Sequence, residues 1–94
     1  MTADPDVPWG LVSEVRRSRR KTQIIEILSE EPAAATDVAS EIRLETKTVS
    51  NYFLELKTTE PPLIKCLTPE QPHHRLYCLT ETGDVVSNHI GSNN

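Results

Sequence analysis

The sequence predicts a mainly α-helical domain that carries one β-hairpin, which is an α+β architecture. Apolar residues recur with helical spacing in the segment 11–29 and twice more between residues 35 and 57. Two short segments, 63–68 and 75–80, are rich in Ile, Leu, Tyr, Thr and Cys, and a polar loop bounded by prolines joins them, as in a hairpin. Val85, Val86 and Ile90 then predict a short C-terminal helix.

The length and composition limit the size of the core. The 94 residues form one small domain, and a hydrophobic content of 36% predicts a modest, aliphatic core. We expect a flexible tail at 1–12, the domain at 13–90 and a frayed end at 91–94. The sequence has neither an apolar run of membrane-spanning length nor a basic start followed by an apolar stretch, so we expect a cytoplasmic protein.

The first helical segment, 11–29, has an apolar face formed by Ile24, Ile25, Ile27 and Leu28. Either Ser13 or Ser18 is suited to cap its start. Pro32 ends it, because the residue before a proline avoids the helical conformation. We interpret Trp9 as a contact that holds this helix within the chain, and the alternative is a contact with a second subunit.

Two short amphipathic segments between residues 35 and 57 predict a helix-turn-helix. Thr36 is expected to cap the first segment, with Asp37 in its first turn, and Leu44 lies in the break between the two. The apolar faces are Val38, Ala39 and Ile42 in the first segment and Val49, Phe53 and Leu56 in the second.

The outward face of the second segment is suited to DNA. It carries small polar groups and one amine close to the helix start, which fit a helix that enters a major groove. Its members are Lys47, Asn51, Leu54 and Thr58, with Thr48 and Ser50 at the edges. The alternative is a pair of ordinary core helices with solvated outer faces.

Two stretches of the chain resemble known regulators. Leu44, the run 48–50, Phe53 and Leu56 resemble the second half of the helix-turn-helix in ArsR- and MarR-type regulators. Residues 75–83 resemble the second wing strand and following turn of small archaeal winged-helix regulators. The resemblance covers roughly residues 18–90. It implies a winged helix-turn-helix, with a three-helix core, a wing and a short C-terminal helix, that works as a homodimer on a near-palindromic DNA site.

The sequence departs from the family pattern at several positions. Arg43 stands where the family has Gly, and a left-handed backbone there would cost on the order of 1 kcal/mol. Glu45 replaces the usual Ser or Thr cap, and Thr46 is the candidate to cap the helix instead. Leu54 occupies an outward position that is commonly polar, and Glu55 would repel phosphate near the DNA-facing side.

We therefore predict a sequence-specific, double-stranded DNA-binding transcriptional regulator, with a recognition helix at about 46–58 in the major groove and a wing at about 63–80 on the backbone or minor groove. Asn51 is suited to bidentate pairing with adenine. Five of the ten basic residues lie in the segment 16–21, which would contact flanking phosphates or face a partner. The predicted DNA-binding residues are Thr46, Lys47, Thr48, Ser50, Asn51, His73, His74, Arg75, Arg19 and Arg20.

The rival hypothesis is a winged-helix protein–protein interaction module of a transcription or replication assembly. The formal net charge of −4, together with Leu54 and Glu55 on the presumed reading face, favours this rival. The local basic cluster and the resemblance to stand-alone regulators favour DNA. A salt titration of duplex binding distinguishes the two hypotheses.

A homodimer interface is predicted at the chain ends, because a core of this size has little room for the apolar residues there. They are Trp9, Leu11, Val12, Val85, Val86 and Ile90. The alternative is that the terminal segments pack back on their own domain and leave a monomer.

Two cysteines, Cys66 and Cys78, fit free thiols in a reducing compartment. With His73, His74 and His89 they lie near the hairpin, but their spacing matches no compact ligand motif, so we expect packing and not a metal site. If the two cysteines pair directly they face each other, and a shift of one residue puts them on opposite faces. No motif for catalysis or cofactor binding is present, so we expect neither an enzyme nor a cofactor.

Overall fold

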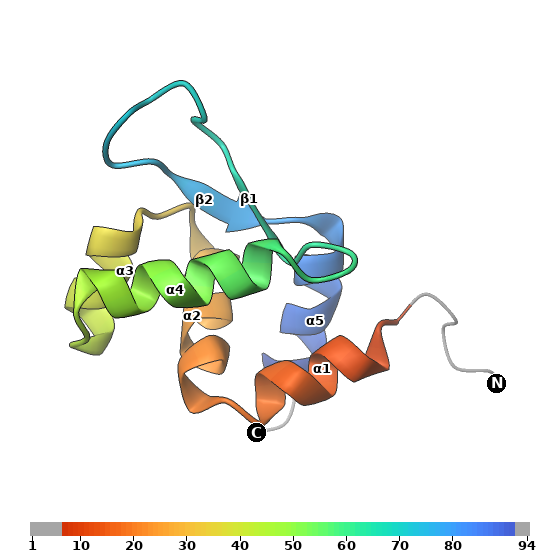
Figure 1. The fold of residues 1–94 in the computed structure, drawn as a ribbon. Coiled ribbons are helices and arrows are strands. Elements are labelled where there is room, and N and C mark those ends of the chain that lie inside the picture. Colours follow the sequence, from red (N-terminus) through yellow and green to blue (C-terminus); the bar gives the residue numbers. More distant parts are fainter. Residues whose placement is uncertain (1–6, 92–94) are drawn as a thin grey trace, which may run out of the picture.

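The structure is a computed structural model that describes residues 7–91 (Figure 1). Two antiparallel strands form a hairpin that stands against a bundle of helices, so the predicted α+β winged-helix class is confirmed. In chain order the elements are α1 Trp9–Arg16, α2 Arg19–Glu30, α3 Ala35–Ile42, α4 Thr46–Lys57, β1 Ile64–Cys66, β2 Tyr77–Leu79 and α5 Glu81–Gly91.

The N-terminal segment forms two helices and not the single helix that was predicted. Ser18 has an extended backbone, with φ −113° and ψ 112°, and its Oγ accepts a hydrogen bond from the Lys21 N–H at 3.2 Å. Ser18 is therefore the cap of α2. The predicted tail also reaches too far, because α1 begins at Trp9, and Val7 and Val12 are buried. Residues 1–6 and 92–94 lie outside the described part.

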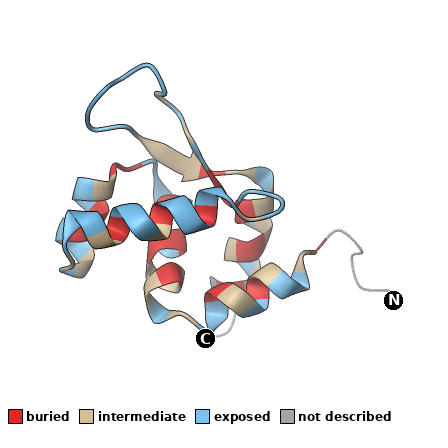
Figure 2. Ribbon diagram, in the orientation of Figure 1, coloured by how far each residue is buried: buried red, intermediate tan, exposed pale blue. Residues whose placement is uncertain are grey.

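The apolar faces of the helices meet in one core, which also includes Leu63 and Ile64 at the start of the hairpin (Figure 2). Val38, Val49, Phe53 and Leu56 are buried, as their helical spacing predicts. Ile42 and Leu44 are partly buried and pack against the core. Ile27 was expected on the core face of its helix, but it is only half-buried, because that part of α2 faces a groove.

The helix-turn-helix is formed by α3 and α4. Arg43 ends α3 in the left-handed conformation, with φ 62° and ψ 46°, so this turn tolerates a residue other than Gly. Two of the predicted caps are wrong. Thr36 lies inside α3, which follows Ala34, and α4 follows Glu45 without any side-chain cap, because the helix already begins at Thr46.

The hairpin register separates the two cysteines. Lys65 pairs with Cys78 and Cys66 pairs with Tyr77, so the thiols are offset by one residue and point to opposite faces. Ala33 forms an isolated bridge with Tyr77, which ties the segment before α3 to the hairpin. Each strand has three residues, fewer than predicted, because the ladder ends where the long loop begins.

The terminal helices pack against their own chain. Val12, Val86 and Ile90 are 2%, 0% and 8% exposed, so these three residues of the predicted dimer interface belong to the core. The prediction was wrong for them because α1 and α5 contact each other and α2, and so cover one another's apolar faces. Trp9 is 52% exposed, and its ring lies 4.7 Å from that of His89, which confirms a contact within the chain. No helix in residues 7–91 has the length and hydropathy to cross a bilayer.

Candidate nucleic-acid interface

Helix α4 has one buried face and one solvent-exposed face. Val49, Phe53 and Leu56 are buried, and the Phe53 ring meets that of Tyr77 on β2 edge-on at 5.0 Å. This contact ties α4 to the hairpin. The outward face is exposed as predicted, and it carries Lys47, Asn51, Leu54 and Thr58.

A groove of about 400 Å³ separates α4 from the hairpin loop. It is lined by Ala34, Ala35, Thr36, Thr46, Ser50, Pro72, His73, His74, Arg75 and Tyr77. These residues supply hydroxyl groups, two imidazoles, a phenol and a guanidinium, and no carboxylate is among them. Such a lining suits phosphate oxygens, because it offers several hydrogen-bond donors and one permanent positive charge.

The hairpin loop bends back towards the start of α3. His74 adopts φ 55°, and its Nδ1 lies 3.4 Å from Thr36 Oγ1 while its Nε2 lies 3.5 Å from Asp37 Oδ2. Within the loop, Arg75 Nε donates to the carbonyl oxygen of Gln71 at 2.6 Å. The His74 and Asp37 side chains are 59% and 58% exposed, so their attraction is weak and open to exchange with another anion.

A buried lysine joins α2 to the flank of α4. Lys21 Nζ lies 3.0 Å from Glu55 Oε1 and 3.1 Å from Glu14 Oε2. Burial acts to lower the pKa of Lys21, but hydrogen bonds and charge attraction from Glu55 and Glu14 together raise it above the ordinary value. Lys21 is thereby engaged within the protein, and the negative charge of Glu55 is balanced at this flank.

The structure brings half of the ten predicted DNA-binding residues to the groove. These are Thr46, Ser50, His73, His74 and Arg75. Lys47 and Asn51 are exposed on the adjoining face of α4, and Thr48 is half-buried. Arg19 and Arg20 do not line the groove, since they lie at the start of α2, where Arg20 Nη1 donates to Gln23 Oε1 at 3.2 Å.

Of the five groove residues that were not predicted as site residues, Thr36 and Tyr77 have polar side chains. Thr36 was assigned to a cap and Tyr77 to a strand, yet both line the groove. The bridge between Ala33 and Tyr77 brings the start of α3 to the hairpin, so these two side chains meet although they are far apart in the sequence. Within residues 7–91, no three His, Cys, Asp or Glu side chains are arranged to hold a metal ion.

Comparison with solved structures identifies the fold. The chain superposes on a double mutant of ZitR from Lactococcus lactis with a TM-score of 0.68, at 20% identity over 80% of this chain and 51% of that one. A ZitR mutant with a single cysteine-to-serine change superposes with a TM-score of 0.68, at 17% identity over 98% of this chain and 56% of that one. The apo form of the double mutant superposes with a TM-score of 0.69, at 18% identity over 89% of this chain and 64% of that one. The chain thus spans between half and two thirds of these proteins. No protein-family model and no curated protein matches the sequence. The chain has the winged-helix fold that ZitR has.

Proposed function

We propose that the protein is a sequence-specific transcriptional regulator that binds double-stranded DNA through α4 and the hairpin. The observation that carries this proposal is the carboxylate-free groove, which lies beside the exposed polar face of α4. A major-groove helix flanked by a wing needs this arrangement, because base edges and a phosphate backbone must be contacted side by side.

The residues divide into two roles. Asn51 projects about 200° around α4 from the buried Val49, which suits bidentate pairing with an adenine edge. Lys47, Thr46 and Ser50 are exposed near the start of the helix, where they would position the protein on the backbone. Phosphate would replace Asp37 as the partner of His74, while Arg75 contacts the backbone or the minor groove.

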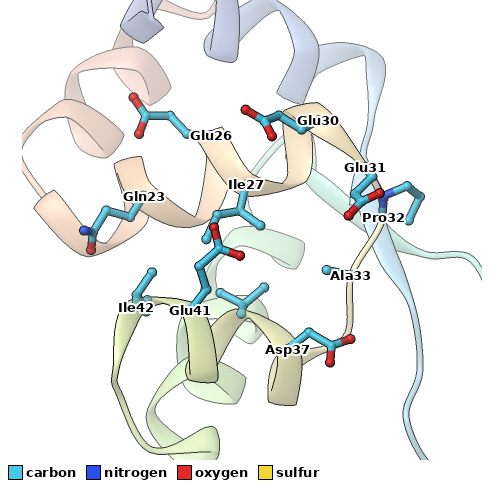
Figure 3. A pocket seen from close by; sticks show the side chains of 11 residues that line it. Gln23, Glu26, Ile27, Glu30, Glu31, Pro32, Ala33, Asp37, Glu41 and Ile42 are labelled. Carbon is cyan, nitrogen blue, oxygen red and sulfur yellow. The ribbon is translucent and has the colours of Figure 1, made fainter.

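The acidic net charge is compatible with this function because acidic residues gather elsewhere. Four of the fourteen carboxylates, Glu26, Glu30, Glu31 and Glu41, line a separate groove between α2 and α3 (Figure 3) and are not among the residues of the groove beside α4. Without those four, ten acidic side chains remain against ten basic ones. The remaining charge would therefore not exclude DNA from the α4 face.

A salt titration of duplex binding tests the proposal. The logarithm of the binding constant should fall linearly with the logarithm of the salt concentration, by about 0.9 per phosphate contact. Lys47→Ala and Arg75→Ala should each reduce the slope by about 1. Arg17→Ala, an exposed arginine of the basic segment 16–21 at the end of α1, tests that segment separately: the slope falls if the segment contacts flanking phosphates and stays unchanged if it does not. A duplex affinity that does not depend on salt would exclude the proposed interface.

A protein-docking module is the second candidate, because Leu54 is 54% exposed on the outward face of α4. An apolar side chain there is suited to contact another protein or the methyl group of thymine. A folded protein that binds no duplex at low salt would favour docking.

We further propose a cytoplasmic homodimer of the archaeal ArsR/MarR type, because one recognition helix covers few base pairs. The interface predicted at the chain ends is not retained. Three of its residues are buried in the core, and only Trp9, Leu11 and Val85 remain at the surface or half-buried.

A further inference from the structure

Leu54 interrupts the polar surface of α4. The outward side of this helix is exposed along its length (Figure 2), and Leu54 is the one large hydrophobic residue of α4 on it, with a side chain that is 54% exposed. Its neighbours three and four positions away on the helix surface are all polar and exposed, and they are Ser50, Asn51, Lys57 and Thr58. Leu54 is therefore a single apolar group within a polar face.

The fold does not use the side chain of Leu54. The buried face of α4 is formed by Val49, Phe53 and Leu56, and Leu54 is not among the residues that pack against the core. Its carbonyl oxygen accepts hydrogen bonds from the N–H and the Oγ1 of Thr58 at 3.1 Å and 2.8 Å, which any residue at position 54 would do. The leucine side chain is therefore available for a contact outside the chain.

Leu54 lies in line with two of the predicted DNA-binding residues. Lys47, Asn51 and Leu54 follow one another at intervals of four and three positions, so they form one row along the outward face of α4. The step from Asn51 to Leu54 is about 4.5 Å along the helix axis, and successive base pairs are about 3.4 Å apart. A helix that places Asn51 on a base edge therefore brings Leu54 close to a neighbouring base pair.

The groups that base pairs present in the major groove are hydrogen-bond donors and acceptors, with one apolar exception, the C5 methyl group of thymine. A surface for protein docking is typically a contiguous apolar patch, whereas one leucine among polar neighbours matches one methyl group. We propose that Leu54 is a specificity-determining residue that recognises the methyl group of a thymine beside the base pair read by Asn51. This inference rests on the proposed function, because it requires α4 to lie in the major groove.

The charges around Leu54 permit this approach. Glu55 follows it directly, but the Glu55 carboxylate lies 3.0 Å from the buried Nζ of Lys21 on α2, which balances its negative charge. Lys57, on the other side, is exposed and forms no salt bridge with residues 7–91, so its ammonium group is available to a phosphate near the same base pair.

Removal of single methyl groups from the DNA tests the contact. The parent first selects duplex sites from a random pool, and each thymine of a selected site is then replaced in turn by deoxyuridine, which lacks only the C5 methyl group. At constant salt, at least one replacement should weaken binding by the parent about fourfold, which corresponds to the loss of one buried methyl group. Leu54→Ala should bind the thymine and deoxyuridine forms of that site equally, because the side chain that contacts the methyl group is absent.

Leu67→Ala is the matched control, since it removes a 45% exposed leucine that follows β1 and does not lie on α4. This variant should keep the fourfold difference at the same thymine. Salt-dependent duplex binding by a parent that tolerates every replacement would overturn the inference and leave the proposed function standing, and so would an equal loss in Leu54→Ala. A folded parent that binds no duplex would overturn both, so the two failures are distinguishable.

Discussion

Lys21 of α2 and Glu55 of α4 are joined by a salt bridge of 3.0 Å between a buried ammonium group and a half-exposed carboxylate. Glu14 of α1 completes the arrangement at 3.1 Å. Three helices therefore meet at one cation. Because α4 presents the candidate reading face, this cation helps to set the position of that face relative to the rest of the domain.

Lys21→Met should reduce the free energy of unfolding by roughly 1–3 kcal/mol at neutral pH, because two carboxylates lose a charged hydrogen-bond donor. The pKa of Lys21 is raised above its ordinary value of 10.5 in the folded protein. The stabilisation by the Lys21 ammonium group is therefore fully present below about pH 10.5 and is lost as the pH rises through the folded-state pKa. Urea unfolding from neutral to alkaline pH measures the free energy of unfolding of the parent and the variant.

The exposed Lys65 offers the matched control, since it forms no salt bridge with residues 7–91. Lys65→Met should have the same free energy of unfolding as the parent at neutral pH. Because it keeps Lys21, it should also lose stability at alkaline pH as the parent does. Equal stability of the two methionine variants at neutral pH would show that the cation at position 21 does not stabilise the fold.

Gly83→Ala should strongly destabilise the protein, because the new Cβ would overlap the carbonyl oxygen of Leu63. That oxygen also accepts a hydrogen bond from the Thr80 N–H at 3.0 Å. Leu63 and the start of α5 therefore cannot move apart to make room for the new Cβ without losing this hydrogen bond. Gly10→Ala is the control, since its Cβ meets no atom within 4 Å, and it should stabilise α1 by up to about 1 kcal/mol. Thermal unfolding of both variants checks this, and a common midpoint would contradict it.

Phe53→Ala should cost roughly 3–5 kcal/mol, since the side chain is 3% exposed and its removal leaves a cavity beside Tyr77. Leu54→Ala, one residue further along α4, removes a 54% exposed side chain and should change stability by at most about 0.5 kcal/mol. Denaturant titration measures both. A small loss for Phe53→Ala would mean that the helical phase of α4 is wrong.

Asn51→Ala should relax or abolish sequence preference with little change in stability, because Asn51 is exposed on the outward face of α4. Selection of binding sites from a random duplex pool compares the variant with the parent. Asn88→Ala, an exposed position on α5, is the control and should select the same sites as the parent. Unchanged specificity in Asn51→Ala would remove this residue from the reading role.

The sequence alone determined the helix-turn-helix and the hairpin. Val49, Phe53 and Leu56 mark the buried face of α4 through a local period of 3.6 residues, and that period survives in the structure. The break between α1 and α2 was missed, because Ser13 and Ser18 are equally good caps by residue type. Only the backbone conformation distinguishes them.

Tertiary packing decided the contacts between distant residues and the strand register, which the periodicity of the sequence does not predict. Thr36 and His74 are 38 residues apart, yet they meet at the groove beside α4, because the Ala33 bridge brings α3 to the hairpin. The hairpin register decided that Cys66 and Cys78 point to opposite faces. An apolar residue such as Val86 must be buried, but the sequence does not state against which surface. That choice depends on the shapes of α1, α2 and α5, which exist only once the chain has folded.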